Sequence, residues 1–240
     1  MIETPLQQRQ TKPATIGPIN ADKTVTSNST PTGEVAYPRS PSESFLTSQF
    51  HRPRGFFGRV AGWMMSWRRS NRLRNLLLID LLDLKPDSRV LEIGPGPGLA
   101  LAAAAREVTT GDLVAIDHSE VMLAQTAARN RDLLSERRLT LIHGDATDLP
   151  VDVSGFDFIW AMNVWQFWTD QRSTIADLAA RLNPGGTLVI GHQQRGATAD
   201  VDPGTTRRHL QAQLRAAGLD VEYRVAGLQP PVSYVIGHRG

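Results

Sequence analysis

One stretch decides the fold of this chain: Val90-Leu91-Glu92-Ile93-Gly94-Pro95-Gly96-Pro97-Gly98-Leu99. It opens with a short, mostly apolar run with β-branched members, which is typical of a strand covered on both faces. The alanine-rich segment 99–106 that follows is a strong helix former. The stretch therefore predicts a strand, a glycine loop and a helix, and its glycines remove Cβ atoms where a ligand or another segment approaches the backbone.

The spacing of the glycines argues against a dinucleotide. A dinucleotide fingerprint has the spacing Gly-x-Gly-x-x-Gly, whereas Gly98 comes one residue early. Pro95 and Pro97 carry no N–H, so the loop offers few donors to a pyrophosphate. The loop thus favours a nucleoside ligand without phosphates. A turn that is rich in glycine only for packing is the alternative, and an NAD-dependent dehydrogenase is kept as a rival function.

The composition divides the chain of 240 residues into three parts. Residues 1–44 are dominated by Thr, Ser, Pro, Gln and Asn, which predicts a disordered tail. Residues 45–84 are expected to form helices that cap the site, and residues 85–240 to form the ligand-binding domain. The absence of cysteine excludes a disulfide scaffold, a thiol nucleophile and a cysteine-ligated metal, and no metal site is expected.

The location of the protein is expected to be cytoplasmic. The sequence shows neither a signal peptide nor an apolar stretch long enough to cross a bilayer. With a net charge of only +2, attraction to polyanions would have to come from a local cluster.

Such a cluster lies between Arg52 and Arg74, where arginines alternate with aromatic and aliphatic residues at helical spacing. One interpretation is an amphipathic helix that contacts an anionic membrane surface or a lipid substrate. The other is a helix that packs on the domain and leaves its arginines in water. Binding to nucleic acid is not expected.

Downstream of the glycine loop, strands alternate with helices, which predicts a parallel sheet with right-handed crossovers. Asp117 ends the second strand and can accept hydrogen bonds from both hydroxyls of a ribose. Asp145 follows the third strand and can accept from an adenine amine, while Met122 can lie against an adenine face. The alternatives are that Asp117 is only a charge at a helix terminus, that Asp145 is a turn aspartate and that Met122 packs in the core.

Aromatic residues gather after the fourth strand. Asn163, Trp165 and Trp168 should face the crevice at the carboxyl ends of the strands. Together with Trp63 and Trp67 of the basic segment, the two tryptophans are expected to form walls of a substrate pocket. Filling of the core is the alternative.

In order and spacing, these motifs resemble the class I S-adenosylmethionine-dependent methyltransferases. The resemblance covers residues 70–240 and is nearest to the small-molecule branch that includes ubiquinone/menaquinone-type and phospholipid N-methyltransferases. It implies an α/β, Rossmann-like, doubly wound sheet of seven strands in the order 3-2-1-4-5-7-6, with the last strand antiparallel. The motifs that carry it are Glu92 to Gly98, Asp117, Gly144-Asp145-Ala146, Phe156-Asp157-Phe158-Ile159 and Leu182-Asn183-Pro184-Gly185-Gly186.

The resemblance also implies a role for each site residue around the donor S-adenosylmethionine. At the methionine portion, Gly94, Gly96 and Gly98 would shape the loop and Glu92 would orient the amino group. Asp117 would hold the ribose, and His118 would face the adenosine. Met122 would flank the adenine, Asp145 and Ala146 would hold the edge of the adenine, and Asn163 would lie near the sulfonium.

Methyl transfer from a sulfonium is an in-line displacement, so the enzyme mainly has to orient donor and acceptor, an effect of roughly 7 to 11 kcal/mol. A base is needed only if the acceptor must lose a proton. His192 is the main candidate, and His143 the second. No Asn-Pro-Pro-Tyr motif follows the fourth strand, which argues against a nucleobase or glutamine acceptor and favours an aromatic, lipidic or amine acceptor. A non-catalytic adenosyl-ligand domain that docks on a membrane or partner through the arginine-rich segment is a further alternative.

Overall fold

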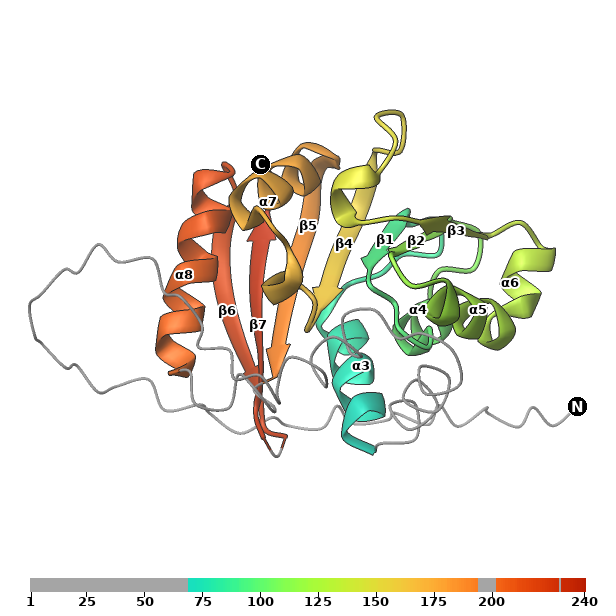
Figure 1. The fold of residues 1–240 in the computed structure, drawn as a ribbon, viewed down its shortest axis with the longest axis horizontal. Coiled ribbons are helices and arrows are strands. Elements are labelled where there is room, and N and C mark those ends of the chain that lie inside the picture. The colour runs from blue at the N-terminus through green and yellow to red at the C-terminus, as the bar shows by residue number, and fades with distance from the viewer. Residues whose placement is uncertain (1–68, 194–201, 229) are drawn as a thin grey trace, which may run out of the picture. The chain divides into compact units, whose positions relative to one another are not determined.

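The structure is a computed structural model that describes residues 69–193, 202–228 and 230–240 (Figure 1). The predicted tail, most of the predicted capping segment and both of its tryptophans lie outside the described residues. In the part that is described, no helix is long and apolar enough to cross a membrane.

A single sheet of seven strands forms the centre of the described residues. The strands are β1 (Val90–Ile93), β2 (Leu113–Asp117), β3 (Leu139–His143), β4 (Phe156–Met162), β5 (Leu182–Gln193), β6 (Asp220–Ala226) and β7 (Val232–His238). Their order is β3-β2-β1-β4-β5-β7-β6, and β7 is antiparallel to both of its neighbours while β1 to β5 are parallel. The predicted strand order and the antiparallel last strand are both confirmed.

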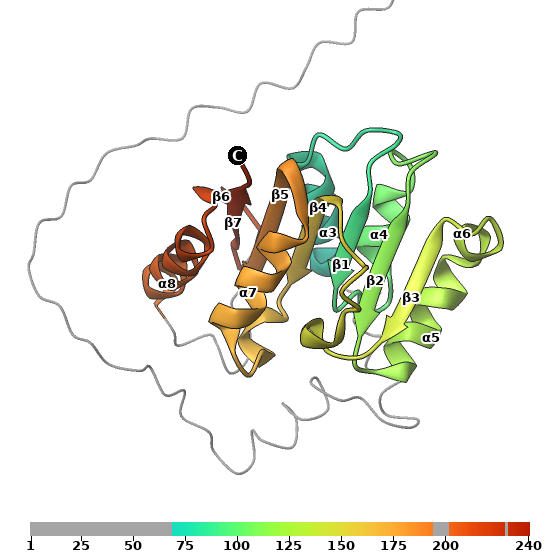
Figure 2. The same cartoon turned by 90° about the horizontal axis from the view of Figure 1, so that it is seen from above.

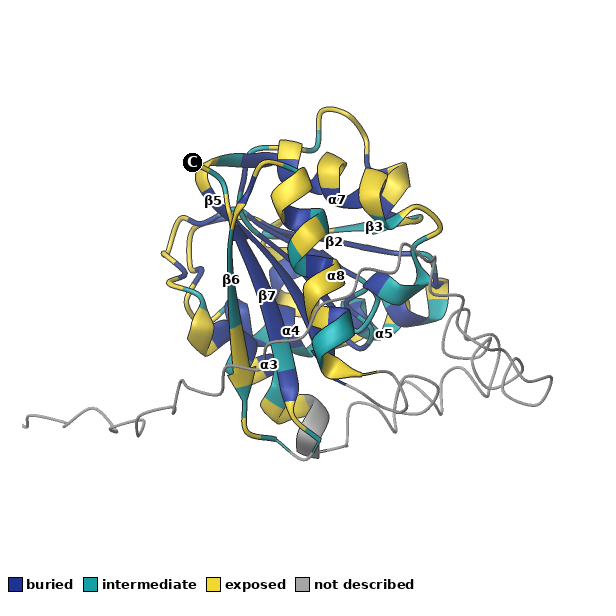
Figure 3. Ribbon diagram, turned by 90° about the vertical axis from the view of Figure 1, so that its left-hand side faces the viewer, coloured by how far each residue is buried: buried dark blue, intermediate teal, exposed yellow. Residues whose placement is uncertain are grey.

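Helices cover both faces of the sheet, as the doubly wound prediction requires (Figure 2). Because side chains alternate along a strand, Leu91 and Ile93 belong to one core and Val90 to the other. The first core is closed by α7 (Gln171–Ala180) and α8 (Pro203–Ala216). The second core is closed by α3 (Arg69–Leu81), α4 (Leu99–Ala104) and α6 (Arg131–Ser135). Figure 3 shows the resulting pattern, with buried central strands between helices whose outer sides are exposed and with the edge strand β6 largely outside the core.

Two local features interrupt the regular elements. Asn130 separates α5 (Glu120–Arg129) from α6, and its side chain donates to the Thr126 carbonyl (2.9 Å). Residues 183–186 lie inside β5 as a bulge, because the register jumps from Phe156 opposite Leu182 to Phe158 opposite Thr187.

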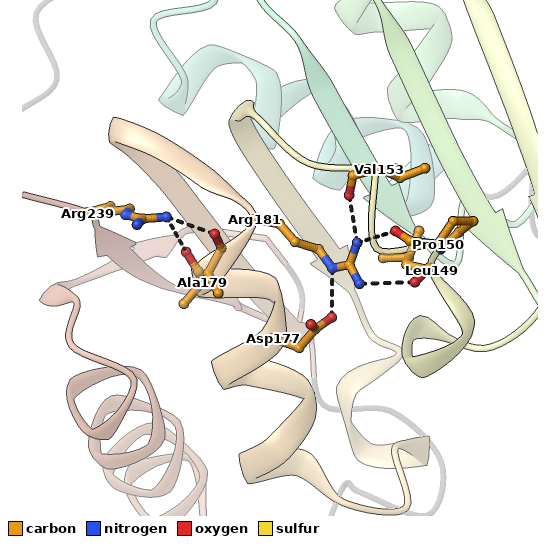
Figure 4. A network of polar contacts seen from close by, with 8 residues as sticks. Leu149, Pro150, Val153, Asp177, Ala179, Arg181 and Arg239 are labelled. Atoms are coloured by element: carbon orange, nitrogen blue, oxygen red, sulfur yellow. Dashed lines mark hydrogen bonds and ion pairs between the residues drawn. The ribbon is translucent and has the colours of Figure 1, made fainter.

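The connection between β3 and β4 is held by one buried arginine, Arg181, at the end of α7 (Figure 4). Its guanidinium donates to the carbonyls of Pro150 (2.7 Å), Val153 (2.6 Å) and Leu149 (3.0 Å). Its Nε donates to the Asp177 carboxylate (2.7 Å), which balances the charge. Removal of Arg181 would leave three carbonyls without these donors, and a buried group that loses its partner carries its full desolvation cost.

We therefore expect Arg181→Met to lower the free energy of unfolding by about 3 kcal/mol, measured by urea denaturation. Arg172→Met is the matched control, because Arg172 is exposed on the same helix and its loss should change stability by about 0.5 kcal/mol or less. Equal stability of the two variants would show that the Arg181 contacts contribute nothing net.

Candidate functional site

The loop between β1 and α4 lies at the carboxyl edge of the parallel strands, and all three of its glycines have positive φ (67°, 54° and 72°). A Cβ on Gly94 would lie 2.6 Å from Val164 Cγ1, and one on Gly98 would lie 2.6 Å from Asn130 Nδ2. Among the described residues, a Cβ on Gly96 would meet nothing within 4 Å. Packing thus explains the first and third glycines, whereas the middle one faces open space.

Two side chains of α5 and that of Asn130, which directly follows it, hold this loop by its carbonyl oxygens. The bonds are Thr126 Oγ1 to Gly96 O (2.8 Å), Arg129 Nε to Pro97 O (2.7 Å) and Asn130 Nδ2 to Gly98 O (3.2 Å). Sequence reasoning missed these three residues. Their spacing of three and four positions places them on one side of a helix, and it is the only signal that could have pointed to them.

Glu92 lies on β1 directly before the loop and is 2% exposed. Burial raises the pKa of its carboxyl to about 8, with the Trp160 indole opposing the shift and Asp117 adding to it. Its Oε2 has no hydrogen-bond partner among the described residues. A desolvated carboxyl with an unpartnered oxygen fits a cationic ligand group, which would stabilise its ionised form.

Asp117 ends β2, next to β1, and is also buried. Burial raises the pKa of its carboxyl to about 6, opposed by the backbone amides of Ser119 and Gly96. Its Oδ1 accepts from the Ser119 amide (2.9 Å) and lies 3.9 Å from Nδ1 of the half-buried His118. The predicted ribose acceptor therefore stands beside the glycine loop.

The residues predicted for the adenine lie at the ends of β2 and β3. In the register of β2 and β3, Asp117 lies opposite His143. The Gly144 backbone amide donates to the Asp117 backbone carbonyl (3.1 Å). Asp145 is exposed, and its amide donates to Asp148 Oδ2 (2.7 Å) at the start of η1 (Ala146–Asp148). Met122 and Ala146 are buried. The edge thus holds a carboxylate in solvent beside two buried apolar groups, and the adenine role of these residues stays a prediction.

Asn163 follows β4 in the left-handed region, with φ 56°. Its backbone amide donates to the Gly191 carbonyl (2.9 Å), and its side-chain Oδ1 accepts from the backbone amide of Gln193 (2.7 Å). These two bonds fix β5 on both sides of His192. Asn163 therefore positions this strand end, whatever further role it has toward a ligand.

His192 is 5% exposed, and neither ring nitrogen has a hydrogen-bond partner among the described residues. Burial lowers its pKa to about 4, so the ring is neutral at pH 7. Its ring meets that of Trp165 edge-on, with centroids 5.9 Å apart. The predicted base thus lies at the same edge as Asn163, in a form that can accept a proton.

The tryptophans after β4 pack against the first core. Trp165, in η2 (Trp165–Phe167), is 2% exposed and belongs to that core, and the partly buried Trp168 packs against it. This placement matches the core alternative for Trp165. Trp63 and Trp67 lie outside the described residues, and the shared pocket wall stays a prediction.

Comparison with known proteins finds similarity to methyltransferases. Residues 90–186 match the model of a methyltransferase domain. An uncharacterized methyltransferase of Bacillus subtilis, YdaC, is 29% identical over 178 residues, which is 72% of this chain and 94% of YdaC. The 27-O-demethylrifamycin SV methyltransferase of Amycolatopsis mediterranei is 29% identical over 60% of this chain, which spans 58% of that enzyme.

Solved structures share the fold. A SAM-dependent methyltransferase from Aquifex aeolicus aligns with a TM-score of 0.61 at 18% identity, over 76% of this chain and 98% of that one. The [4+2]-cyclase SpnF aligns with a TM-score of 0.60 at 20% identity, over 72% and 82%. Together these matches support a class I S-adenosylmethionine-dependent methyltransferase. This sets the dehydrogenase alternative aside.

The ribose role of Asp117 has a pH signature. Ribose hydroxyls donate to the ionised carboxylate, so binding favours the ionised form of a group whose pKa is about 6 in the empty protein. We expect the affinity for 5′-methylthioadenosine, which lacks the amino-acid end, to be full above pH 7 and about tenfold lower at pH 5. Calorimetric titration from pH 5 to 8 measures it, and Asp117→Asn should flatten the profile. A wild-type affinity that is unchanged over this range would remove Asp117 from the ribose site.

Proposed function

We propose that this methyltransferase binds S-adenosylmethionine at the edge formed by Glu92, Gly96 and Asp117 and transfers its methyl group to a small-molecule or lipid acceptor. One observation carries the proposal: two buried carboxyls flank a loop whose middle glycine faces open space. The donor has a cationic amino group at one end and a ribose in its middle, which are the groups that these carboxyls fit.

The chemistry of the loop supports a donor without phosphates. The two prolines remove N–H groups, and α5 holds the carbonyls, so the loop is shaped without becoming a phosphate nest. In the proposed arrangement Glu92 takes the ammonium, Asp117 takes the ribose hydroxyls, and Met122 and Ala146 lie against the adenine, with Asp145 at its edge.

The donor supplies an activated methyl group. The carbon–sulfur bond breaks as the bond to the acceptor forms, the electron pair stays on sulfur, and S-adenosylhomocysteine leaves. The protein contributes orientation, worth roughly 7 to 11 kcal/mol. For a hydroxyl acceptor, His192 would take the proton, because its ring is neutral at pH 7 and neither ring nitrogen has a hydrogen-bond partner among the described residues. Its burial, which lowers the pKa to about 4, makes it a weak base. Asn163 would hold His192 in place through Gly191 and Gln193.

Names among the relatives support a small-molecule acceptor. They include a demethylmenaquinone methyltransferase of Clavibacter sepedonicus and the nocamycin O-methyltransferase of Saccharothrix syringae. The chain spans 40% and 56% of these two proteins, so the acceptor is proposed and not transferred from them. Contact of the arginine-rich segment with a membrane stays part of the proposal, and within its described residues Arg72 is exposed.

The donor site is tested by Gly96→Ala. Its Cβ meets no atom of the described residues within 4 Å, so the expected cost to folding is left-handed strain of about 1 to 2 kcal/mol, while the methyl group enters the proposed donor's space. We expect at least a tenfold loss of S-adenosylmethionine affinity by calorimetry. Gly218→Ala is the matched control, because Gly218 has φ 82° and equally open surroundings but lies between α8 and β6. Equal donor affinity of both variants would contradict the site.

Catalysis is tested with methyl-labelled donor and a pool of small molecules and lipids, followed by mass identification of the labelled product. We expect S-adenosylhomocysteine and a labelled acceptor in equal amounts. Tight donor binding with neither product from any pool would instead favour the non-catalytic ligand-binding alternative.

A further inference from the structure

The sheet ends at β6, and in the described part of the chain β7 is the only strand beside it. β6 runs over seven residues in unbroken register with β7, contains no proline and has no buried residue (Figure 3). Native proteins often shorten, kink or cover an edge strand, because its unpaired N–H and C=O groups can bind a further strand. β6 is neither short nor kinked, so its edge is suited to pairing with another strand.

The backbone groups that point away from β7 belong to alternate residues of β6. The Arg239 amide donates to the Gly186 carbonyl (2.9 Å), so Arg239 directs its backbone groups to β5 and the preceding His238 directs its groups to β6. His238 lies opposite Asp220, which therefore directs its own groups to β7. By alternation, the outward N–H and C=O groups belong to Val221, Tyr223 and Val225.

Only a few registers are possible when β6 pairs antiparallel with a second copy of itself. Residues directly opposite each other both direct their backbone groups across the pair or both away from it, so the twofold axis passes through one residue. With the axis at Tyr223, the whole strand pairs, and Glu222 of each copy lies opposite Arg224 of the other. Opposite charges in directly opposed positions stabilise a strand pair.

Every other register is less favourable. A shift of the axis by one residue places Glu222 opposite Glu222 or Arg224 opposite Arg224, and like charges in this position are destabilising. Each further shift shortens the pairing. The charges of the strand therefore select the register that also makes the largest number of backbone hydrogen bonds.

The side chains of β6 agree with this register on both faces. Val221 and Tyr223 pack against the first core, so Val225 belongs to the same face, where it is 48% exposed. The pairing would place Val221 of the second copy against Val225. On the other face Glu222 Oε2 lies 2.7 Å from Arg224 Nη2 of its own copy, and the pairing would give each carboxylate a second guanidinium.

Tyr223, at the axis, is already held within its own copy. Its hydroxyl bonds to the Ser233 hydroxyl (2.9 Å), and the Arg207 guanidinium of α8 lies over its ring, 5.1 Å from the centroid. The pairing therefore depends on the backbone and on the opposed charges, and not on new contacts of the Tyr223 ring.

We propose that this protein forms a homodimer in which two copies of β6 pair antiparallel about an axis at Tyr223 and join the two sheets into one. A second copy is the occupant that the strand itself favours, because Glu222 and Arg224 complement each other between copies in the register of greatest length. Three strands separate β6 from β1, so the interface is independent of the proposed donor site.

Sedimentation velocity of the full chain over a range of concentrations tests the dimer. The wild-type protein should sediment as a dimer that dissociates on dilution. Glu222→Arg and Arg224→Glu should each raise the dissociation constant of the dimer at least about tenfold, because each places like charges opposite each other twice. Arg172→Glu is the matched control, since it makes the same charge change at an exposed position of α7 and should leave the dissociation constant unchanged.

Mixing the two charge variants tests the register. In a mixed dimer, a copy with two arginines at these positions faces a copy with two glutamates, so Glu222→Arg and Arg224→Glu should pair with about wild-type affinity. The contact between residues 222 and 224 within each copy stays lost, so restored pairing cannot come from the separate chains. Native mass spectrometry should find this mixed dimer, but few mixed dimers of Glu222→Arg with Arg172→Glu, which carry the same total charge.

Val225→Pro provides a test that does not involve charge. It removes an outward amide without removing a bond to β7, so the protein should keep its fold by circular dichroism and become monomeric. A dimer that is unaffected by Val225→Pro and by both charge variants would overturn the proposal, because its interface would lie elsewhere. A wild-type protein that is monomeric at all concentrations would overturn it without any substitution, and would leave the β6 edge to another segment or to solvent.

Discussion

The donor site depends on how α5 holds the glycine loop. The prolines at positions 95 and 97 take N–H groups out of the loop, so the loop cannot be shaped by a nest of its own amides. Side chains of α5 and of Asn130, which follows it, bind the carbonyls of Gly96, Pro97 and Gly98 instead. Gly94 and Gly98 are packed against neighbouring residues, so among the described residues only Gly96 of this loop faces open space.

Around this loop the parallel sheet brings two carboxyls out of water. Parallel strands end at the same edge, so Glu92 on β1 and Asp117 on β2 lie near each other with a desolvation cost that raises the pKa of each. Acidic groups that bear such a cost in an empty site are stabilised when a ligand supplies a cation or hydroxyl donors. Arg74 lies at the same edge, where its guanidinium donates to Oε1 of Gln193.

Much of this architecture can be read from the sequence. The strand-loop-helix stretch, the alternation of strands and helices and the acidic residues at strand ends predict a parallel sheet and the edge at which the site lies, because these features are local. The order of the strands came from the resemblance to a known family. Arg74 and Gln193 could not be paired in this way, since 119 positions separate them and their contact depends on how α3 packs. Trp165 shows a second limit, because a tryptophan after a strand fits a core and a pocket wall equally well until its burial is known.

The fold alone leaves the reaction open, since one structural neighbour is a methyltransferase and another a [4+2]-cyclase. The central claim is that the buried carboxyls receive the donor, and proton release on binding tests it most directly. At pH 7 Glu92, with a pKa of about 8, is mostly protonated in the empty protein and must ionise to hold an ammonium. Calorimetric titration of S-adenosylmethionine in two buffers of different ionisation enthalpy should show release of nearly one proton, lost in Glu92→Gln. Binding enthalpies that do not differ between the buffers would contradict the account.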